Sequence, residues 1–392
     1  MKRKLLIILI IICLFSFFDS KNVTVFAEQN IEQEIENEVN NQLGNLDISE
    51  IEDIVLNLTE DQKGIFGNET FWEKINRLLA GDMSTDEGVF KGVINLFFDS
   101  LLNLIPMLAL IVAIAILFSM VSQTRSGFKS NSIKDIIHFV CYGSIIMIVL
   151  SCTVSVIGNV TSSIELLKKQ MDAIFPVLLT LLTAIGGTAS VAVYQPAFAI
   201  LTGGVMTLFS KILLPIFICC LVFSILSNLT SNIKFDKFVS FFSASFKWLI
   251  GICFTVFFGF VAIRGITAGS FDGVSIRTAK YAIKSSIPLI GGYMSDGFNL
   301  IMASSVLIKN AIGAGGFLLL IASLVFPVIE LVLLMFGLKL TSAILEPLTD
   351  SRISNFISSV AKCISLLIAL VVAVAFMYIL LIGLVMCSAN IY

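Results

Sequence analysis

The sequence predicts an all-α, polytopic membrane protein with about seven helical spans, an N-terminal signal peptide and a small helical extracytoplasmic segment. Of its 392 residues, 57% are apolar and only 13% are charged, whereas about 25% of the residues of a soluble domain carry a charge. Apolar runs recur along the chain that reach the roughly 20 residues a helix needs to cross a membrane. These observations exclude an ordinary soluble domain.

The first 27 residues predict a secretory signal peptide. Residues 2–4 are all lysine or arginine, residues 5–18 form an apolar core, and Ala27 supplies a small residue before a predicted cleavage at Glu28. An uncleaved signal anchor is the alternative. Both interpretations export the residues that follow.

Residues 28–98 predict an acidic, helical extracytoplasmic segment. Residues 28–92 contain 16 Asp and Glu against 4 Lys and Arg, a net charge of −12, whereas residues 100–392 contain 9 against 17, a net charge of +8. Apolar residues in the acidic segment recur at helical spacing, but such thin stripes make a marginal core. We therefore expect the segment to pack on the membrane domain or a partner; a solvated spacer is the alternative.

Residues 99–392 predict the membrane domain. The expected spans are residues 99–121, 136–158, 174–193, 200–226, 246–263, 312–338 and 363–387. With an exported N-terminus, the basic loops 122–135 and 264–309 fall in the cytoplasm, as the positive-inside rule requires. Loop 227–247 contradicts this pattern, because it carries three lysines on the predicted outer side. A re-entrant hairpin over 174–226 would reverse everything after it.

The loop after residue 263 contains a predicted amphipathic helix that begins near Val274. Asp272 or Ser275 can cap this helix, and Arg277, Lys280 and Lys284 then share one face at spacings of three and four. Asp272, Arg277, Lys280 and Lys284 are candidates for docking a partner or lipid from the cytoplasmic side. An ordinary positive-inside anchor is the alternative.

Two charged residues fall in predicted apolar surroundings. Glu330 lies within an apolar run, and Lys339 follows nine residues later. Because an isolated charge in hydrocarbon is unfavourable, Glu330 is expected to face protein or water. It either lines a pathway or joins two helices.

The chain contains a weak internal repeat. Residues 175–196 and 326–347 share seven identities at an offset of 151 residues, including Pro176 with Pro327 and Pro196 with Pro347. These four prolines are predicted helix breaks, and proline-interrupted segments at matching positions are typical of duplicated transporter cores. Coincidence in apolar sequence is the alternative.

The sequence predicts no catalytic, cofactor-binding or metal site, and therefore no enzyme. It lacks a phosphate-binding loop with the required lysine, and Gly313-Ala314-Gly315-Gly316 instead predicts close helix packing. His138 is the single histidine, and the eight cysteines form no C-x-x-C pair. We also expect no nucleic-acid partner.

Several motifs in order resemble the stage III sporulation protein AE family of endospore-forming bacteria. The strongest matches are Gly265–Ala268, Asp272-Gly273, Arg277–Lys280, Ile287-Pro288 and Leu307–Asn310, supported by Gly186-Gly187 with Pro196, Leu214-Pro215 and Ala343–Leu348. The resemblance covers nearly the whole chain.

The resemblance implies a location in the mother-cell membrane around the forespore, with the N-terminal segment in the intermembrane space. It implies membership in a secretion-like channel complex that supports forespore development and includes other stage III subunits and a secretion-type ATPase. It supplies no catalytic residues. The residues alone leave open a self-sufficient secondary transporter or permease with a duplicated core.

Overall fold

The computed structural model describes residues 38–39, 41–44, 46–80, 87–123, 131–229, 235–286, 291–349 and 351–388. All regular structure in these residues is helical, which confirms the predicted all-α class. The predicted signal peptide, its cleavage point and all of residues 28–37 lie outside the described part.

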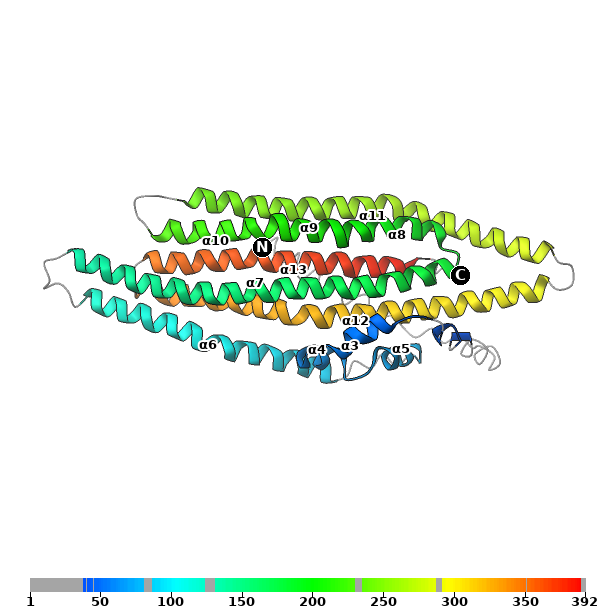
Figure 1. Cartoon of the computed structure of the whole chain (residues 1–392), viewed down its shortest axis with the longest axis horizontal. Coiled ribbons are helices and arrows are strands. Elements are labelled where there is room, and N and C mark those ends of the chain that lie inside the picture. Colours follow the sequence, from blue (N-terminus) through cyan, green and yellow to red (C-terminus); the bar gives the residue numbers. More distant parts are fainter. Residues whose placement is uncertain are drawn as a thin grey trace.

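The described helices form an elongated bundle with three short helices on one flank (Figure 1). They are α3 (Ser49–Leu56), α4 (Glu60–Phe66), α5 (Phe71–Leu79), α6 (Glu87–Gln123), α7 (Asn131–Ala184), α8 (Thr188–Ala199), α9 (Met206–Leu208), α10 (Leu214–Leu229), α11 (Asp236–Ser286), α12 (Gly291–Leu345) and α13 (Ser351–Cys387). Two π-helical stretches, Ile200–Val205 and Phe209–Leu213, join α8 to α10 through α9.

Six helical stretches in the described residues are long and apolar enough to cross a membrane, close to the predicted seven. They are Lys91–Leu117, Phe139–Ala184, Thr188–Asn228, Asp236–Ala262, Gly297–Leu345 and Ser351–Cys387. The predicted span 174–193 is wrong, because α7 continues to Ala184 and the chain then reverses at residues 185–187. Gly186 has φ +90°, a left-handed conformation that favours glycine.

Four of these stretches are longer than a membrane requires. At about 1.5 Å per residue, stretches of 37, 41, 46 and 49 residues are about 55–75 Å long, against a hydrocarbon core of about 30 Å. Each of these four stretches is therefore longer than a single perpendicular membrane crossing requires.

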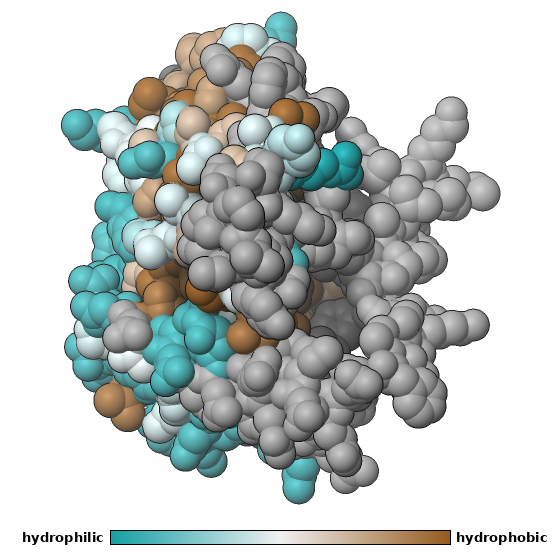
Figure 2. Space-filling model, turned by 90° about the vertical axis from the view of Figure 1, so that its right-hand side faces the viewer, coloured by the Kyte–Doolittle hydropathy of each residue, from teal (hydrophilic) through white to brown (hydrophobic). Residues whose placement is uncertain are grey.

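Exposed apolar side chains gather in one half of the bundle, which we call the membrane half. They include Leu102, Leu117 and Met120 of α6, Phe139, Met147 and Val154 of α7, Ile218, Val222 and Leu226 of α10, Phe238, Phe241, Trp248 and Val256 of α11, and Val332, Phe336, Leu340 and Ile344 of α12. The other half, the distal half, contains α3–α5, the end of α7, α8, the end of α11, the start of α12 and the end of α13 (Figure 1). Viewed from its end, hydrophilic side chains cover much of the described surface (Figure 2).

Helix α13 is the most enclosed of the six candidate spans. Half of its apolar window is buried, and its buried residues recur at spacings of three and four along the whole helix. It packs against α7, α8, α10, α11 and α12. The core of the bundle is therefore continuous between the membrane half and the distal half.

Chain direction determines which helix ends lie together. Helices α6, α8–α10 and α12 run toward the membrane half, and α7, α11 and α13 run back (Figure 1). The junction between α11 and α12 therefore lies at the same end as α3–α5. An exported N-terminal segment and a cytoplasmic Arg277 cannot both be correct, so the predicted sidedness of residues 264–309 relative to the N-terminus is wrong.

Candidate functional site

Asp272 lies buried inside the distal half of α11. Its carboxylate accepts hydrogen bonds from the backbone N–H groups of Ala189 at 2.9 Å and Ser190 at 3.1 Å. These groups begin α8, whose N-cap is Gly187, a residue with no side chain to accept them. Asp272 therefore closes the N-terminus of another helix. The predicted cap near Val274 is wrong, because α11 runs unbroken to Ser286, and a buried Asp272 is not available to a partner.

Lys309 of α12 lies close to the C-terminal end of α13. Its fully buried ammonium donates a hydrogen bond to the backbone carbonyl of Ser388, directly after α13. The hydroxyls of Ser388 and Tyr194 are 2.8 Å apart and share a hydrogen bond. A carboxylate thus meets the N-terminus of α8 and an ammonium meets the C-terminus of α13, which is the favourable pairing with each helix dipole.

We call Ser190, Tyr194, Asp272, Lys309 and Ser388 the buried polar cluster. Tyr194 joins its two parts, because it belongs to α8, whose first turn Asp272 closes, and its hydroxyl contacts Ser388. Sequence reasoning missed Tyr194 and the role of Lys309. The available signal was a lone lysine in the otherwise uncharged run 297–329. The cluster connects α8, α11, α12 and α13 and holds no group arranged for catalysis.

Glu330 forms the main polar contact between α7 and α12. The Asn159 side-chain amide donates to both carboxylate oxygens, at 3.0 and 3.1 Å. Gln170 and Ser323 make a second contact between these helices, at 2.6 Å. Lys339 does not approach this pair: it is exposed, near the membrane-half end of α12. Of the two predicted intramembrane polar residues, only Glu330 lies between helices.

Three of the four predicted proline breaks are wrong. Pro176 lies inside α7, Pro196 inside α8 and Pro327 inside α12, and all three helices continue through them. Pro347 alone lies outside a helix, in the turn after Leu345. A proline removes one backbone hydrogen bond from its helix, and the packing of these three helices against their neighbours offsets that loss. Because α7 ends 8 residues after Pro176 and α12 ends 18 residues after Pro327, the proposed repeat has no matching structural units.

The glycines of residues 313–316 bring three elements against α12. A Cβ on Gly313 would overlap Met386 of α13, a Cβ on Gly315 would lie 3.1 Å from Phe71 of α5, and one on Gly316 would lie 2.9 Å from Ile174 of α7. The predicted close packing at these residues is confirmed. This stretch of α12 is where the N-terminal segment meets the bundle.

The N-terminal segment is a folded part of the distal half. Phe71 and Ile75 are fully buried, and Gln42 forms hydrogen bonds with Ser304 and Ser305 of α12, at 3.1 and 2.7 Å. A capping box between Thr70 and Glu73 begins α5. The segment therefore packs on the membrane domain rather than forming a solvated spacer.

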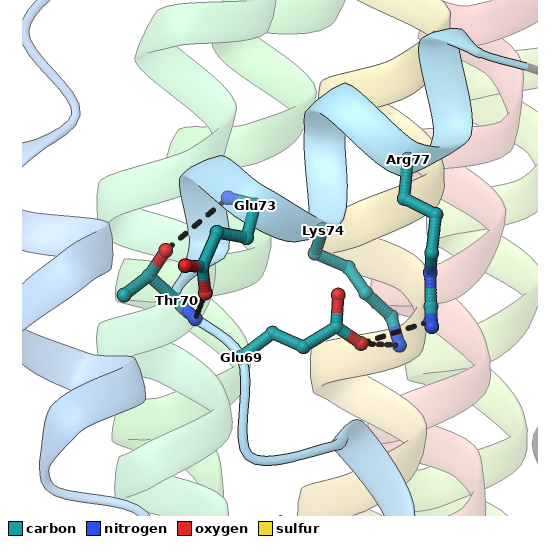
Figure 3. Close-up of polar contacts among 5 residues, drawn as sticks. All are labelled: Glu69, Thr70, Glu73, Lys74 and Arg77. Atoms are coloured by element: carbon teal, nitrogen blue, oxygen red, sulfur yellow. Dashed lines mark hydrogen bonds and ion pairs between the residues drawn. The ribbon is translucent and has the colours of Figure 1, made fainter.

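Ion pairs connect the residues just before α5 to the helix itself. Glu69 lies between Lys74 and Arg77, at 3.2 and 3.0 Å (Figure 3). Lys74 is almost completely buried and also lies over the ring of Phe66. These contacts use two of the four cations in residues 28–92 internally, so most of the acidic charge of the segment remains uncompensated.

Arg277 lies on an exposed face of α11 in the distal half. Val274 is 64% exposed and Tyr281 is 75% exposed, and Arg277 and Thr278 are exposed between them. We call these four residues the distal α11 face. The side chains of Lys280 and Lys284 lie outside the described part.

The described residues contain no group of three or more His, Cys, Asp or Glu side chains that could hold a metal ion. The candidate functional features of the described residues are the buried polar cluster, the acidic segment packed on α12 and the distal α11 face.

Comparison with known proteins gives one consistent result. The family model of stage III sporulation protein AE matches residues 70–389. Stage III sporulation protein AE of Bacillus subtilis (strain 168) is 25% identical over 334 residues, which cover 85% of this chain and 82% of that protein. No solved structure matches. Since the family model covers most of the chain, including all six candidate membrane-crossing helices of the described residues, this protein belongs to the stage III sporulation protein AE family.

Proposed function

We propose that this sporulation membrane protein is a subunit of a secretion-like channel complex between mother cell and forespore, required for forespore development. The observation that carries the proposal is the distal half. Four of the six apolar helices continue well beyond the length a membrane requires, and the acidic segment packs on their extension. Such a structure presents a rigid surface on one side of the membrane, which suits an assembly subunit that meets partners there.

The proposed orientation places the distal half in the intermembrane space. The signal-like sequence before residue 28 favours export of the acidic segment. The three connections at the opposite end (121–137, 229–237 and 339–352) together contain seven Lys and Arg against four Asp and Glu. This excess favours the cytoplasm for that end. A secretion-type ATPase would then meet these basic connections and not the helix that contains Arg277.

The permease alternative has lost its main support, since the repeat has no structural counterpart. The Asn159–Glu330 pair joins two helices through both carboxylate oxygens, which fits interhelical contact. A channel subunit and a self-sufficient transporter differ in their dependence on partners.

The decisive experiment compares the protein alone and in its complex. Affinity purification of the tagged full-length chain from sporulating cells should recover other stage III membrane subunits, with an unrelated tagged multi-pass protein as the control. The purified chain in liposomes should not move labelled amino acids or monovalent ions. Transport by the chain alone, without co-purified subunits, would establish the permease instead.

A further inference from the structure

We propose that copies of this chain associate side by side in the membrane, with acidic residues 28–44 of one copy docked on the distal α11 face of the next. This inference does not require the channel role. It rests on the exposed face, on charge complementarity and on the positions of the two surfaces in the bundle.

The distal α11 face has the composition of a protein contact. Val274 and Tyr281, seven residues apart, lie on one side of the helix with Arg277 between them. The two are 64% and 75% exposed, and they lie after the candidate membrane span of α11, which ends at Ala262. Arg277 forms no hydrogen bond or ion pair with any described residue. An aromatic ring beside an unpaired guanidinium is a frequent centre of protein interfaces.

The complementary surface is the beginning of the acidic segment. Residues 28–44 contain five glutamates, at positions 28, 32, 34, 36 and 38, and no lysine or arginine. The sequence of α11 adds Lys280 and Lys284 next to Arg277. Residues 28–44 thus carry negative charge, and residues 277–284 of α11 carry positive charge. Pairs between a guanidinium and a carboxylate both attract the two surfaces and fix how they align.

The described end of the acidic segment, residues 41–44, lies at about the same height as the distal α11 face. Gly316 of α12 packs on Ile174 of α7, and Gly186, at the far end of α7, packs on Ile276 of α11. The eleven residues from Ile174 to Ile185 rise about 16 Å, and the same rise along α12 leads from Gly316 to about residue 305. Gln42 is hydrogen-bonded to Ser304 and Ser305. Residues 28–44 therefore end level with Ile276.

The two surfaces lie on different flanks of one copy. Helices α3–α5 pack against α6, α7 and α12, whereas α11 runs along the opposite edge of the bundle (Figure 1). Gln42, in the described part of the acidic segment, thus lies on α12 and not on the α11 face of its own chain. Two copies standing in one membrane bring the segment of one to the α11 face of the other. The two surfaces differ, so in a pair one copy still has a free acidic segment and the other still has a free α11 face. Further copies can therefore add in the same way, and the assembly can close into a ring.

The test uses the full-length chain with two different affinity tags, co-expressed and purified in mild detergent, with copy number measured by native mass spectrometry. One variant, Arg277→Glu, changes the α11 face. A second, with Glu32→Gln, Glu34→Gln and Glu36→Gln together, changes the segment. Lys169→Glu is the control, because Lys169 is an exposed cation on α7 in the same half. Because Arg277 is exposed, its variant should fold normally, which an unchanged melting temperature would verify.

The wild type and the control should form oligomers. Each variant alone should associate at least about tenfold more weakly, equivalent to about 1.4 kcal/mol, and the wild-type association should weaken as salt screens it. The two variants mixed should form pairs and nothing larger, since only one intact segment and one intact face remain between them.

Three outcomes would overturn the proposal. The first is a monomeric wild type. The second is an Arg277→Glu variant that forms wild-type oligomers. The third is a Glu34→Cys, Thr278→Cys double variant whose cross-link forms within one chain, which would show that the segment covers its own α11. Cross-linking between separately tagged Glu34→Cys and Thr278→Cys copies supports the proposal.

Discussion

The carboxylate of Asp272 lies 3.1 Å from the backbone N–H of Ser190, 82 residues earlier in the chain, and closes the first turn of α8. A side chain of one long helix thereby fixes the start of its neighbour. The turn between α7 and α8 depends on this contact, because Gly187 at the N-cap has no side chain to accept these hydrogen bonds.

Replacing Asp272 should destabilise the distal half. Asp272→Ala leaves two N–H groups without their acceptor, and a buried unsatisfied group costs about 1–3 kcal/mol. Asp272→Asn should cost less, because its carbonyl oxygen still accepts one bond. Thermal unfolding of the detergent-purified protein measures the change. Asp53→Ala, at an exposed position on α3, is the control, and an equal effect of the two alanine variants would contradict the capping role.

Gly316→Ala should weaken the contact between α12 and α7. The added Cβ would lie 2.9 Å from the branched side chain of Ile174, and overpacking of this kind typically costs about 1–3 kcal/mol. Gly251→Ala is the matched control, since no atom lies within 4 Å of a Cβ there and alanine favours a helix by about 1 kcal/mol over glycine. The melting temperature should fall for Gly316→Ala and stay level or rise for Gly251→Ala.

Glu330→Gln should be tolerated, whereas Glu330→Leu should not. Glutamine keeps an oxygen for the Asn159 amide, while leucine leaves that amide unpaired between two helices, at a cost of about 1–3 kcal/mol. The double variant Asn159→Leu, Glu330→Leu should recover part of the loss, because both polar partners are then absent. Melting temperatures of these variants and of Asn159→Leu alone check this, and additive losses in the double variant would disprove the coupling.

Cysteines placed at Asn57 and at Thr278 should react from the same side of the membrane. Asn57 lies in the N-terminal segment and Thr278 on α11, both exposed in the distal half. An impermeant thiol reagent applied to spheroplasts should label both, and a cysteine at Ser126, between α6 and α7, only after permeabilisation. The parent chain supplies the background of the native cysteines. Labelling of Asn57 and Thr278 from opposite sides would contradict the arrangement of the six helices.

Much of the fold could be predicted from the sequence because its physical causes are local. Apolar runs indicate membrane helices wherever they occur, and the small residues at 313–316 indicate close packing without knowledge of the partners. The place where a long apolar run turns is different. The chain turns at residues 185–187, which include the double glycine at 186–187. Pro196 is the more conspicuous residue in the sequence, but it lies within α8, because packing against surrounding helices offsets its missing N–H.

The sequence by itself determined that this chain is helical, membrane-embedded and divided into an acidic and a basic part, because composition and periodicity depend only on which residues are neighbours along the chain. Only the tertiary structure decided that Asp272 faces α8, that Lys309 meets the end of α13 and that Arg277 lies on the same side as the N-terminal segment. Each of these depends on the number and direction of the helices in between. One turn too many reverses the side of every residue that follows: the predicted spans imply turns at residues 159–173 and 194–199, whereas the chain turns once, at residues 185–187.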